Sequence, residues 1–279
     1  MFSRRPPKLL FYLLCMLPLC LAVSISYGLS HQQLVPEITS DYSNYRCSTG
    51  TNHPATFRVL TLTVMDSVEL ANRLCATPQV RAQYGMVEIV WHTRGFITAR
   101  DIVEQNYDLF LNRPYLVAGL VPDYERYYRP IITSAPYSVY WISRTSKPEL
   151  TQAYFAGKRV GLLDDFYSQS FFLLPSGSLR AANIQLNDDQ KHLYHDLSSL
   201  YNAFESGEVD LITSPDLGAF SSKIDPLYNL AIEEQAPPIS WFIRRDAGTG
   251  ELHCAVQGII SNTINWMRDA HSNIAQECL

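Results

Sequence analysis

The chain has 279 residues, of which 47% are hydrophobic, and its formal net charge is −5. This length suits one large domain or two lobes of ordinary domain size, and the apolar content is sufficient for real cores. The acidic balance argues against nucleic acid as a partner, because contacts to phosphates require an excess of Lys and Arg.

The first 28 residues have the organisation of a secretory signal. Arg4, Arg5 and Lys8 precede an apolar run at 9–23, which is short for a membrane span, and small residues follow it. We therefore predict a cleaved signal peptide at 1–28; a retained anchor is the alternative. Without this segment Lys+Arg falls from 22 to 19 while Asp+Glu stays at 27, so the exported chain carries a net charge of −8.

Four cysteines remain in the exported chain: Cys47, Cys75, Cys254 and Cys278. An even number in an oxidising compartment predicts disulfides, and the sequence allows three pairings. We favour Cys47 with Cys75 and Cys254 with Cys278, because each bond would tie a terminal segment to a neighbouring helix. No CxxC or Cys/His ligand spacing occurs, so no metal or other cofactor is predicted.

The first half of the chain predicts a parallel sheet. A polar N-terminal extension at 29–56 comes first. Apolar, β-branched runs then alternate with segments of helical spacing, giving a βαβαβ order and hence helices on the faces of a sheet. The predicted strands are 57–64, 86–92 and 107–111, and the predicted helices are 67–75 and 97–105.

A second α/β unit follows an irregular, Tyr-rich stretch. Its predicted strands are 138–144, 158–164, 191–197 and 209–213, and its predicted helices are 168–183, with Pro175 as a break or kink, and 198–207. Gly207 stops the second of these helices. The chain then returns with a strand at 239–245 and a long helix at 252–270, which has one apolar face.

Four segments stand out in chain order, at 124–144, 157–175, 200–216 and 239–252. Taken in this order, they resemble segments of the type II periplasmic solute-binding proteins of the extracellular amino-acid and phosphonate-binding kind. "YERYYRPIITSAPYSVYWISR" is similar to their first crossover, and "GKRVGLLDDFYSQSFFLLP" to the opening strand, ligand loop and helix of their second lobe. "LYNAFESGEVDLITSPD" resembles the segment before the return crossover, and "ISWFIRRDAGTGEL" the closing strand of the first lobe.

The resemblance implies an α/β fold of two lobes joined by two crossover hinges, which close on a ligand. Residues 57–138 and 236–279 would form lobe 1, and residues 139–235 lobe 2. It also implies a non-catalytic, monomeric periplasmic protein that captures a small polar, anionic or zwitterionic solute for the permease of an ABC-type transporter. The alternative is a ligand sensor for a membrane receptor, such as a diguanylate cyclase or a histidine kinase.

The loop after the 158–164 strand is the first candidate ligand site. Tyr167, Ser168, Gln169 and Ser170 stand where a helix should begin, and unpaired N–H groups there, with the hydroxyls, suit an anion. The alternative is that Ser168 or Asp165 simply caps the helix. The neighbouring carboxylates at positions 164 and 165 would repel an anion, which disfavours a phosphonate ligand.

An arginine is expected to bind a ligand carboxylate, because a guanidinium offers paired donors. Arg126 and Arg129 lie in the segment where the amino-acid-binding branch places such an arginine, and Arg113 follows the 107–111 strand. The sequence leaves open which of the three it is, and a solvated surface role is the alternative for each.

The remaining candidates follow strands or belong to an aromatic run. Aromatic side chains suit a binding cleft, and only one of two neighbours on a strand can face it, as for Tyr140 and Trp141. Asp216 could pair with a ligand ammonium, whereas Asp210 is expected to hold a turn. The other predicted cleft residues are Tyr137, Asp66 and Ser67, with helix capping as the alternative for the last two.

Nothing in the sequence predicts catalysis. His192 and His195 have a spacing that binds metal on a helix, but the strand predicted for 191–197 would point them to opposite faces. No G-x-S-x-G, HExxH or phosphate-binding glycine loop is present in the sequence. The chain is therefore predicted not to be an enzyme.

Overall fold

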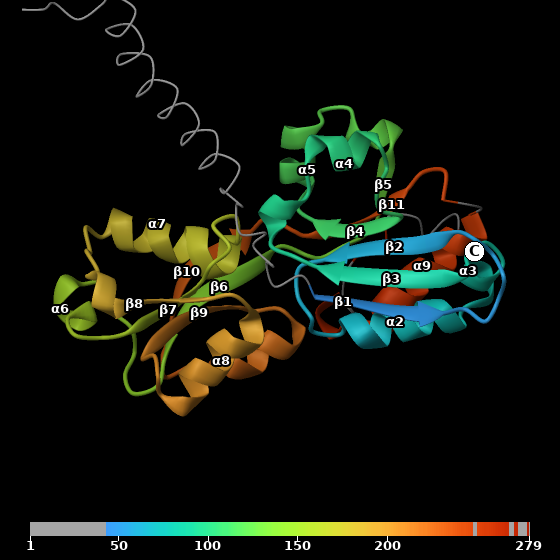
Figure 1. The fold of residues 1–279 in the computed structure, drawn as a ribbon. Helices are drawn as coiled ribbons and strands as arrows, with labels where there is room; N and C mark the ends of the chain where they lie inside the picture. Colours follow the sequence, from blue (N-terminus) through green and yellow to red (C-terminus); the bar gives the residue numbers. More distant parts are fainter. Residues whose placement is uncertain (1–42, 248–249, 268–270, 273–277, 279) are drawn as a thin grey trace, which may run out of the picture. The chain divides into compact units, whose positions relative to one another are not determined.

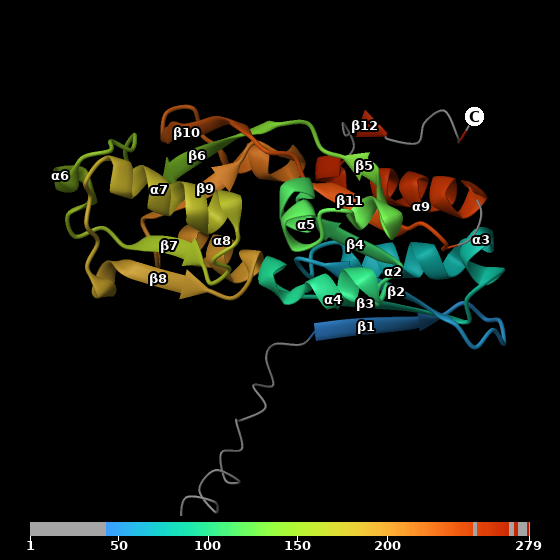
Figure 2. The same ribbon diagram turned by 90° about the horizontal axis from the view of Figure 1, so that it is seen from above.

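The computed structural model describes residues 43–247, 250–267, 271–272 and 278. The predicted signal peptide and most of the predicted extension lie outside these residues. No helix among the described residues is both long and apolar enough to cross a membrane. Figure 1 shows the chain in sequence colours, and Figure 2 shows it from above.

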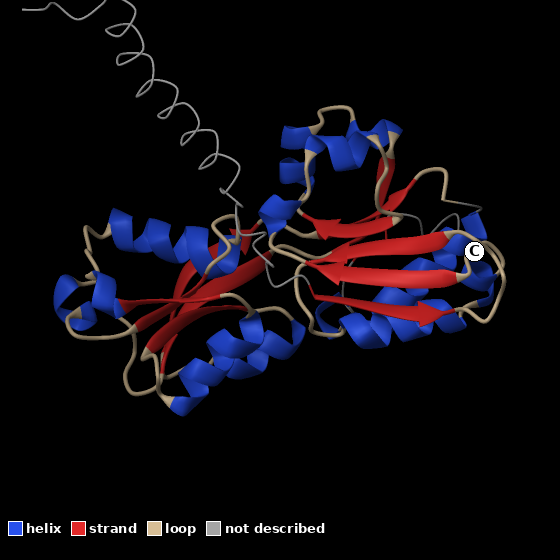
Figure 3. Ribbon diagram, in the orientation of Figure 1, coloured by secondary structure: helices blue, strands red, loops and turns tan. Residues whose placement is uncertain are grey.

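The described residues form two sheets with helices on both faces of each (Figure 3). Sheet A belongs to lobe 1 and has the order β1-β3-β2-β4-β11-β5-β12. Strands β2, β3 and β4 are parallel, and the other pairs are antiparallel. The strands are β1 (Ser43–Ser48), β2 (Thr56–Thr61), β3 (Met86–Trp91), β4 (Leu109–Asn112), β5 (Tyr128–Thr133), β11 (Ser240–Arg244) and β12 (His271–Ser272).

Sheet B belongs to lobe 2 and has the order β10-β6-β9-β7-β8. Strand β7 pairs in parallel with β8 and β9, whereas β6 pairs antiparallel with β9 and β10. The predicted strand around His192 is present as β8. The strands are β6 (Tyr137–Ser143), β7 (Val160–Leu163), β8 (Lys191–Tyr194), β9 (Leu211–Pro215) and β10 (Asn229–Ala236).

Each sheet buries apolar side chains on both faces, which explains why the central strands read as continuous apolar runs. In lobe 1, α2 and α9 pack on one face, while α4 and α5 pack on the other (Figure 1). In lobe 2, α8 covers one face, and α6 and α7 the other. The helices are α2 (Ser67–Ala76), α3 (Pro78–Arg81), α4 (Ala99–Val103), α5 (Pro114–Leu120), α6 (Gln152–Phe155), α7 (Leu174–Ala181), α8 (Leu197–Ser206) and α9 (Gly250–Thr263).

Two short connections join the lobes. Residues 134–136 lead from β5 to β6, and residues 237–239 return from β10 to β11. The connections are hydrogen-bonded to each other: Ser134 donates its N–H to the carbonyl of Ile239 at 2.9 Å, and its hydroxyl accepts the N–H of Ile239 at 3.0 Å. The predicted two-lobed α/β fold with two crossovers is confirmed by this topology.

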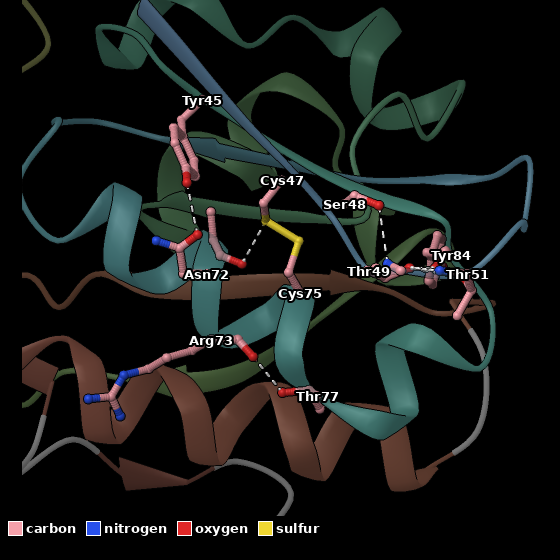
Figure 4. Close-up of a disulfide and its surroundings, with 12 residues drawn as sticks. Tyr45, Cys47, Ser48, Thr49, Thr51, Asn72, Arg73, Cys75, Thr77 and Tyr84 are labelled. Atoms are coloured by element: carbon pink, nitrogen blue, oxygen red, sulfur yellow. Dashed lines mark hydrogen bonds between the residues drawn. A yellow bond between two sulfur atoms is a disulfide. The ribbon is translucent and has the colours of Figure 1, made fainter.

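Both predicted disulfides are present. Cys47 of β1 bonds to Cys75 of α2, and Cys254 of α9 bonds to Cys278. Figure 4 shows the first bond with the polar contacts around it. Within the described residues β1 is an edge strand that pairs with β3 alone, and the Cys47–Cys75 bond attaches it also to the helix beneath the sheet.

Several elements differ from the sequence prediction. Residues 43–48 are not extension but strand β1, because they pair with β3 along their whole length. The predicted 252–270 helix ends at Thr263 as α9, and a short 3-10 turn, η6 (Asn265–Met267), follows. The predicted 168–183 helix starts with a π-helical segment, η3 (Gln169–Leu173), and continues as α7. Helix α5 and strands β5 and β10 were not predicted.

Candidate functional site

Three charged side chains come from loops at the carboxyl ends of buried strands. Arg94 follows β3, Arg113 follows β4 directly and Asp165 follows β7 of the other lobe. In open α/β sheets these loops line the crevice where ligands bind. The three residues therefore lie where this fold builds a site.

Arg94 and Asp165 form an ion pair between the lobes. The Nη1 atom of Arg94 lies 3.2 Å from Oδ2 of Asp165, and the two side chains are 13% and 9% exposed. The Nε atom of Arg94 is buried without a hydrogen-bond partner among the described residues. Burial lowers the pKa of the Arg94 guanidinium, as does the nearby charge of Arg113, whereas Asp165 opposes this shift.

Arg113 is buried and has only uncharged partners. It is 2% exposed, and its guanidinium donates to the carbonyl of Pro237 and to the hydroxyl of Tyr137. Within the described part of the chain no carboxylate forms an ion pair with Arg113, and its Nε has no hydrogen-bond partner. Because Tyr137 begins β6 and Pro237 lies in the return connection, Arg113 links lobe 1 to both crossovers.

The predicted serine loop lies beside this network. The Ser170 hydroxyl is 3.0 Å from the hydroxyl of Tyr137. The backbone carbonyl of Ser170 accepts a hydrogen bond from the hydroxyl of Thr213 at 2.5 Å. Ser168 is 1% exposed, and its hydroxyl has no partner in the described residues. A buried hydroxyl without a partner is costly, and a ligand acceptor would satisfy it.

Two further contacts join the lobes at the more exposed edge of the site. Tyr115 of α5 donates its hydroxyl to Oε1 of Gln169 at 3.0 Å. Tyr167 lies against Gly95, where an added Cβ would come within 2.8 Å of the tyrosine ring. The missing side chain of Gly95 leaves room for the ring at this position, and Tyr167 and Gln169 occupy the edge of the predicted site.

Among the described residues, three predicted ligand contacts form no hydrogen bond or ion pair with this network. Arg126 is 76% exposed and pairs with Asp123 on the surface, and Arg129 contacts His253, whereas Arg113 belongs to the buried network. Tyr140 is partly buried and packs against the core beneath α8, because this face of β6 is covered. Asp216 is exposed after β9, with its backbone N–H bonded to Ser138.

Asp66 and Ser67 stand at the start of α2, where capping was the alternative role. Asp66 has a positive φ of 62° and forms no side-chain cap, whereas the Ser67 hydroxyl donates to the carbonyl of Thr63 at 2.6 Å. Burial, and secondarily Glu69, raises the pKa of Asp66. The adjacent Met65 packs against the core of lobe 2, so this loop also lies between the lobes.

Arg94 was not predicted, and Asp165 was predicted to cap the helix or to repel an anion. A signal was present, since Arg94 follows a buried strand just as Arg113 does. Its partner, however, is 71 positions away, and no local pattern indicates that pairing. The pairing changes the role of Asp165, whose charge is compensated by Arg94.

The arrangement brings two guanidinium groups and one paired carboxylate into a mostly buried place between the lobes. Buried charge is costly unless it is compensated, so the surplus positive charge favours an anionic group. Among the described residues, no group of three or more His, Cys, Asp or Glu side chains could hold a metal ion.

No family model matches the chain, and no curated protein matches it. In fold, the chain is similar to PhnD1 from Prochlorococcus marinus in complex with methylphosphonate (13% identity, TM-score 0.49, 75% of this chain and 85% of that one). It is also similar to an amino acid ABC transporter substrate-binding protein from Streptococcus pneumoniae bound to L-arginine (9%, 0.42, 74% and 87%). A third similar structure is an ancestral arginine-binding protein bound to arginine (13%, 0.42, 74% and 91%).

Proposed function

We propose that this chain is a non-catalytic periplasmic solute-binding protein that captures a small anionic or zwitterionic ligand between its two lobes. The observation that carries the proposal is the buried, uncompensated positive charge of Arg113 at the junction of lobe 1 with both crossovers. A carboxylate or similar group bound there would supply the missing counter-charge, and a guanidinium is well suited to bind it.

Other groups support the same site. The unpartnered hydroxyl of Ser168 and the Nε atoms of Arg94 and Arg113 are buried donors without acceptors in the described residues. A ligand with several oxygen atoms would satisfy them together. The edge residues Tyr167 and Gln169 would then contact the outer part of the ligand.

We further propose that the protein is monomeric and delivers its ligand to the permease of an ABC-type transporter. The support is the order of the four sequence segments, which matches that of solute-binding proteins. A sensing role would use the same site and differ in the partner alone.

A thermal-shift screen with amino acids, phosphonates and other organic acids tests the ligand class. A ligand that binds only the native state raises the melting temperature, by an amount set by its concentration relative to its Kd. We expect at least one anionic or zwitterionic member to raise Tm. If no member of the panel does so, the proposal is wrong.

Two variants then locate the site by titration calorimetry. Arg113→Lys should weaken binding of the identified compound at least about tenfold, because a lysine lacks the paired donors. Arg126→Lys is the matched control, since that arginine lies on the surface, and it should bind normally. Equal affinities of both variants and the wild type would remove Arg113 from the site.

Ser168→Ala provides a second, gentler test. Removing a buried hydroxyl that has no partner should leave the ligand-free Tm unchanged or raise it, while weakening ligand binding. A lower ligand-free Tm with unchanged affinity would show that the hydroxyl serves the fold instead.

A further inference from the structure

Asp165 is a mostly buried carboxylate inside a site that otherwise favours anions. It comes from lobe 2, is 8% exposed and accepts a hydrogen bond from Arg94 of lobe 1 at 3.2 Å. Its other oxygen accepts the backbone N–H of Tyr167 at 3.2 Å. Both oxygens are therefore held in place, and the negative charge is fixed within the site.

The charges of the site leave room for one more negative group. Arg94 and Arg113 contribute two positive charges, and Asp165 compensates one of them. The next acid, Asp164, is 33% exposed and lies 3.4 Å from the side chain of His195, away from this pair. A ligand with one buried negative group would complete the balance, whereas a second such group would be left without a partner.

We propose that Asp165 is a specificity-determining residue, an internal anion that occupies Arg94 and restricts the site to ligands with a single buried negative group. This inference rests on the proposed function, because it concerns the ligand of the same site. It explains why a carboxylate stands in a loop that should otherwise hold an anion. The carboxylate does not prevent anion binding but fixes the number of negative charges that are bound.

Pairs of probes that differ by one carboxylate test the proposal. Suitable pairs are succinate with succinamate, glutarate with glutaramate, and glutamate with glutamine, since an amide replaces a carboxylate of similar size. Titration calorimetry at a pH where every carboxylate is ionised gives the ratio of the two Kd values for each pair. The wild type should prefer the member with fewer carboxylates.

Asp165→Asn should reduce that preference at least about tenfold or reverse it, because like charges within a few ångströms in a poorly solvated site repel strongly. Asp164→Asn is the matched control. It makes the same change of net charge at the adjacent position but outside the Arg94 pair, and should leave the ratio unchanged. Equal shifts in both variants, or no shift in either, would overturn the proposal.

A reverse variant covers the case in which Asp165→Asn does not fold. Arg94→Gln removes one positive charge and should strengthen the preference for the member with fewer carboxylates at least about tenfold. An unchanged ratio in this variant would also overturn the proposal. If the wild type binds none of the members with one carboxylate, the restriction to such ligands is wrong, whereas the proposed function is wrong only if the whole thermal-shift panel also gives no response.

Discussion

The same two dipeptides occur at the parallel strands of both lobes. Arg-Val stands at the first parallel strand (58–59 in lobe 1 and 159–160 in lobe 2), and Asp-Leu stands at the last (108–109 and 210–211). In lobe 1 the backbone N–H of Arg58 donates to the carboxylate of Asp108 at 2.7 Å, and Asp108 returns its N–H to the carbonyl of Arg58 at 2.8 Å. In lobe 2 Arg159 and Asp210 form the same two bonds at 2.9 and 2.8 Å. Each aspartate thus joins the first parallel strand of its lobe, β2 or β7, to the last, β4 or β9.

The surroundings give the two carboxylates opposite properties. Asp108 is 4% exposed and receives the hydroxyl of Tyr84 at 3.2 Å, and burial raises its pKa. The side chain of Asp210 is 35% exposed, and the hydrogen bond from the Arg159 guanidinium holds its pKa below the usual range. The comparison teaches that a shared local pattern sets backbone geometry, whereas burial and partners set the charge state.

The largest expected difference between the lobes comes from the disulfides, because both lie in lobe 1 and residues 139–235 contain no cysteine. Replacing Cys47 and Cys75 together by Ala should lower the free energy of unfolding by about 2 to 5 kcal/mol. Urea unfolding measures this change. A loss below about 1 kcal/mol would mean that β1 needs no attachment to α2.

The second largest difference in stability between the lobes should appear when each of the two aspartates is replaced by alanine. Asp108→Ala leaves the buried hydroxyl of Tyr84 and the partly buried N–H of Arg58 without their acceptor and removes the ion pair with Arg244, and should cost about 3 kcal/mol. Asp210→Ala should cost less, because water can reach the groups left behind. The same urea experiment decides the order. A greater loss in Asp210→Ala would contradict the contrast drawn from burial.

The smallest expected effect is on the pH dependence of stability. An aspartate in an unfolded chain has a pKa of about 3.9. The lowered folded pKa of Asp210 gives stability that is present above that value and lost as the pH falls through the folded pKa. The folded pKa of Asp108 is raised above the unfolded value. It gives stability that is present below the unfolded pKa and lost as the pH rises through the folded pKa.

Asn variants test these signs. Between about pH 6 and pH 3, Asp210→Asn should lose less stability than the wild type, and Asp108→Asn should lose more. Chemical unfolding at several pH values gives both slopes. Changes in the same direction for the two variants would contradict the assigned pKa shifts.

The fold was largely predictable because its central strands are buried on both faces and so form apolar runs bounded by turn residues. Helix α5 was missed although Pro114 at its first turn is a helix-start signal, since the surrounding tyrosines suggested an irregular segment. Edge strand β10 carries few buried residues and pairs with β6 through two register shifts. Its extended conformation depends on that partner rather than on its own pattern.

The site was predictable only in part. The positions of its loops follow from the order of the strands, whereas the pairing of its charged side chains does not. The position of Ser168 and Ser170 after β7 was evident from the alternation of strands and helices. The ion pair of Arg94 with Asp165 joins two lobes, and tertiary packing alone buries Arg113 while leaving Arg126 on the surface. The choice among arginines therefore required the structure.

The central claim, that Arg113 is the anion-binding group, is tested most directly by NMR of arginine side chains. The Nε–H resonance of Arg113, assigned by its loss in Arg113→Lys, should shift on saturation with a compound identified in the thermal screen. The resonance of Arg126 should remain in place. An unchanged Arg113 resonance in the saturated protein would contradict the account.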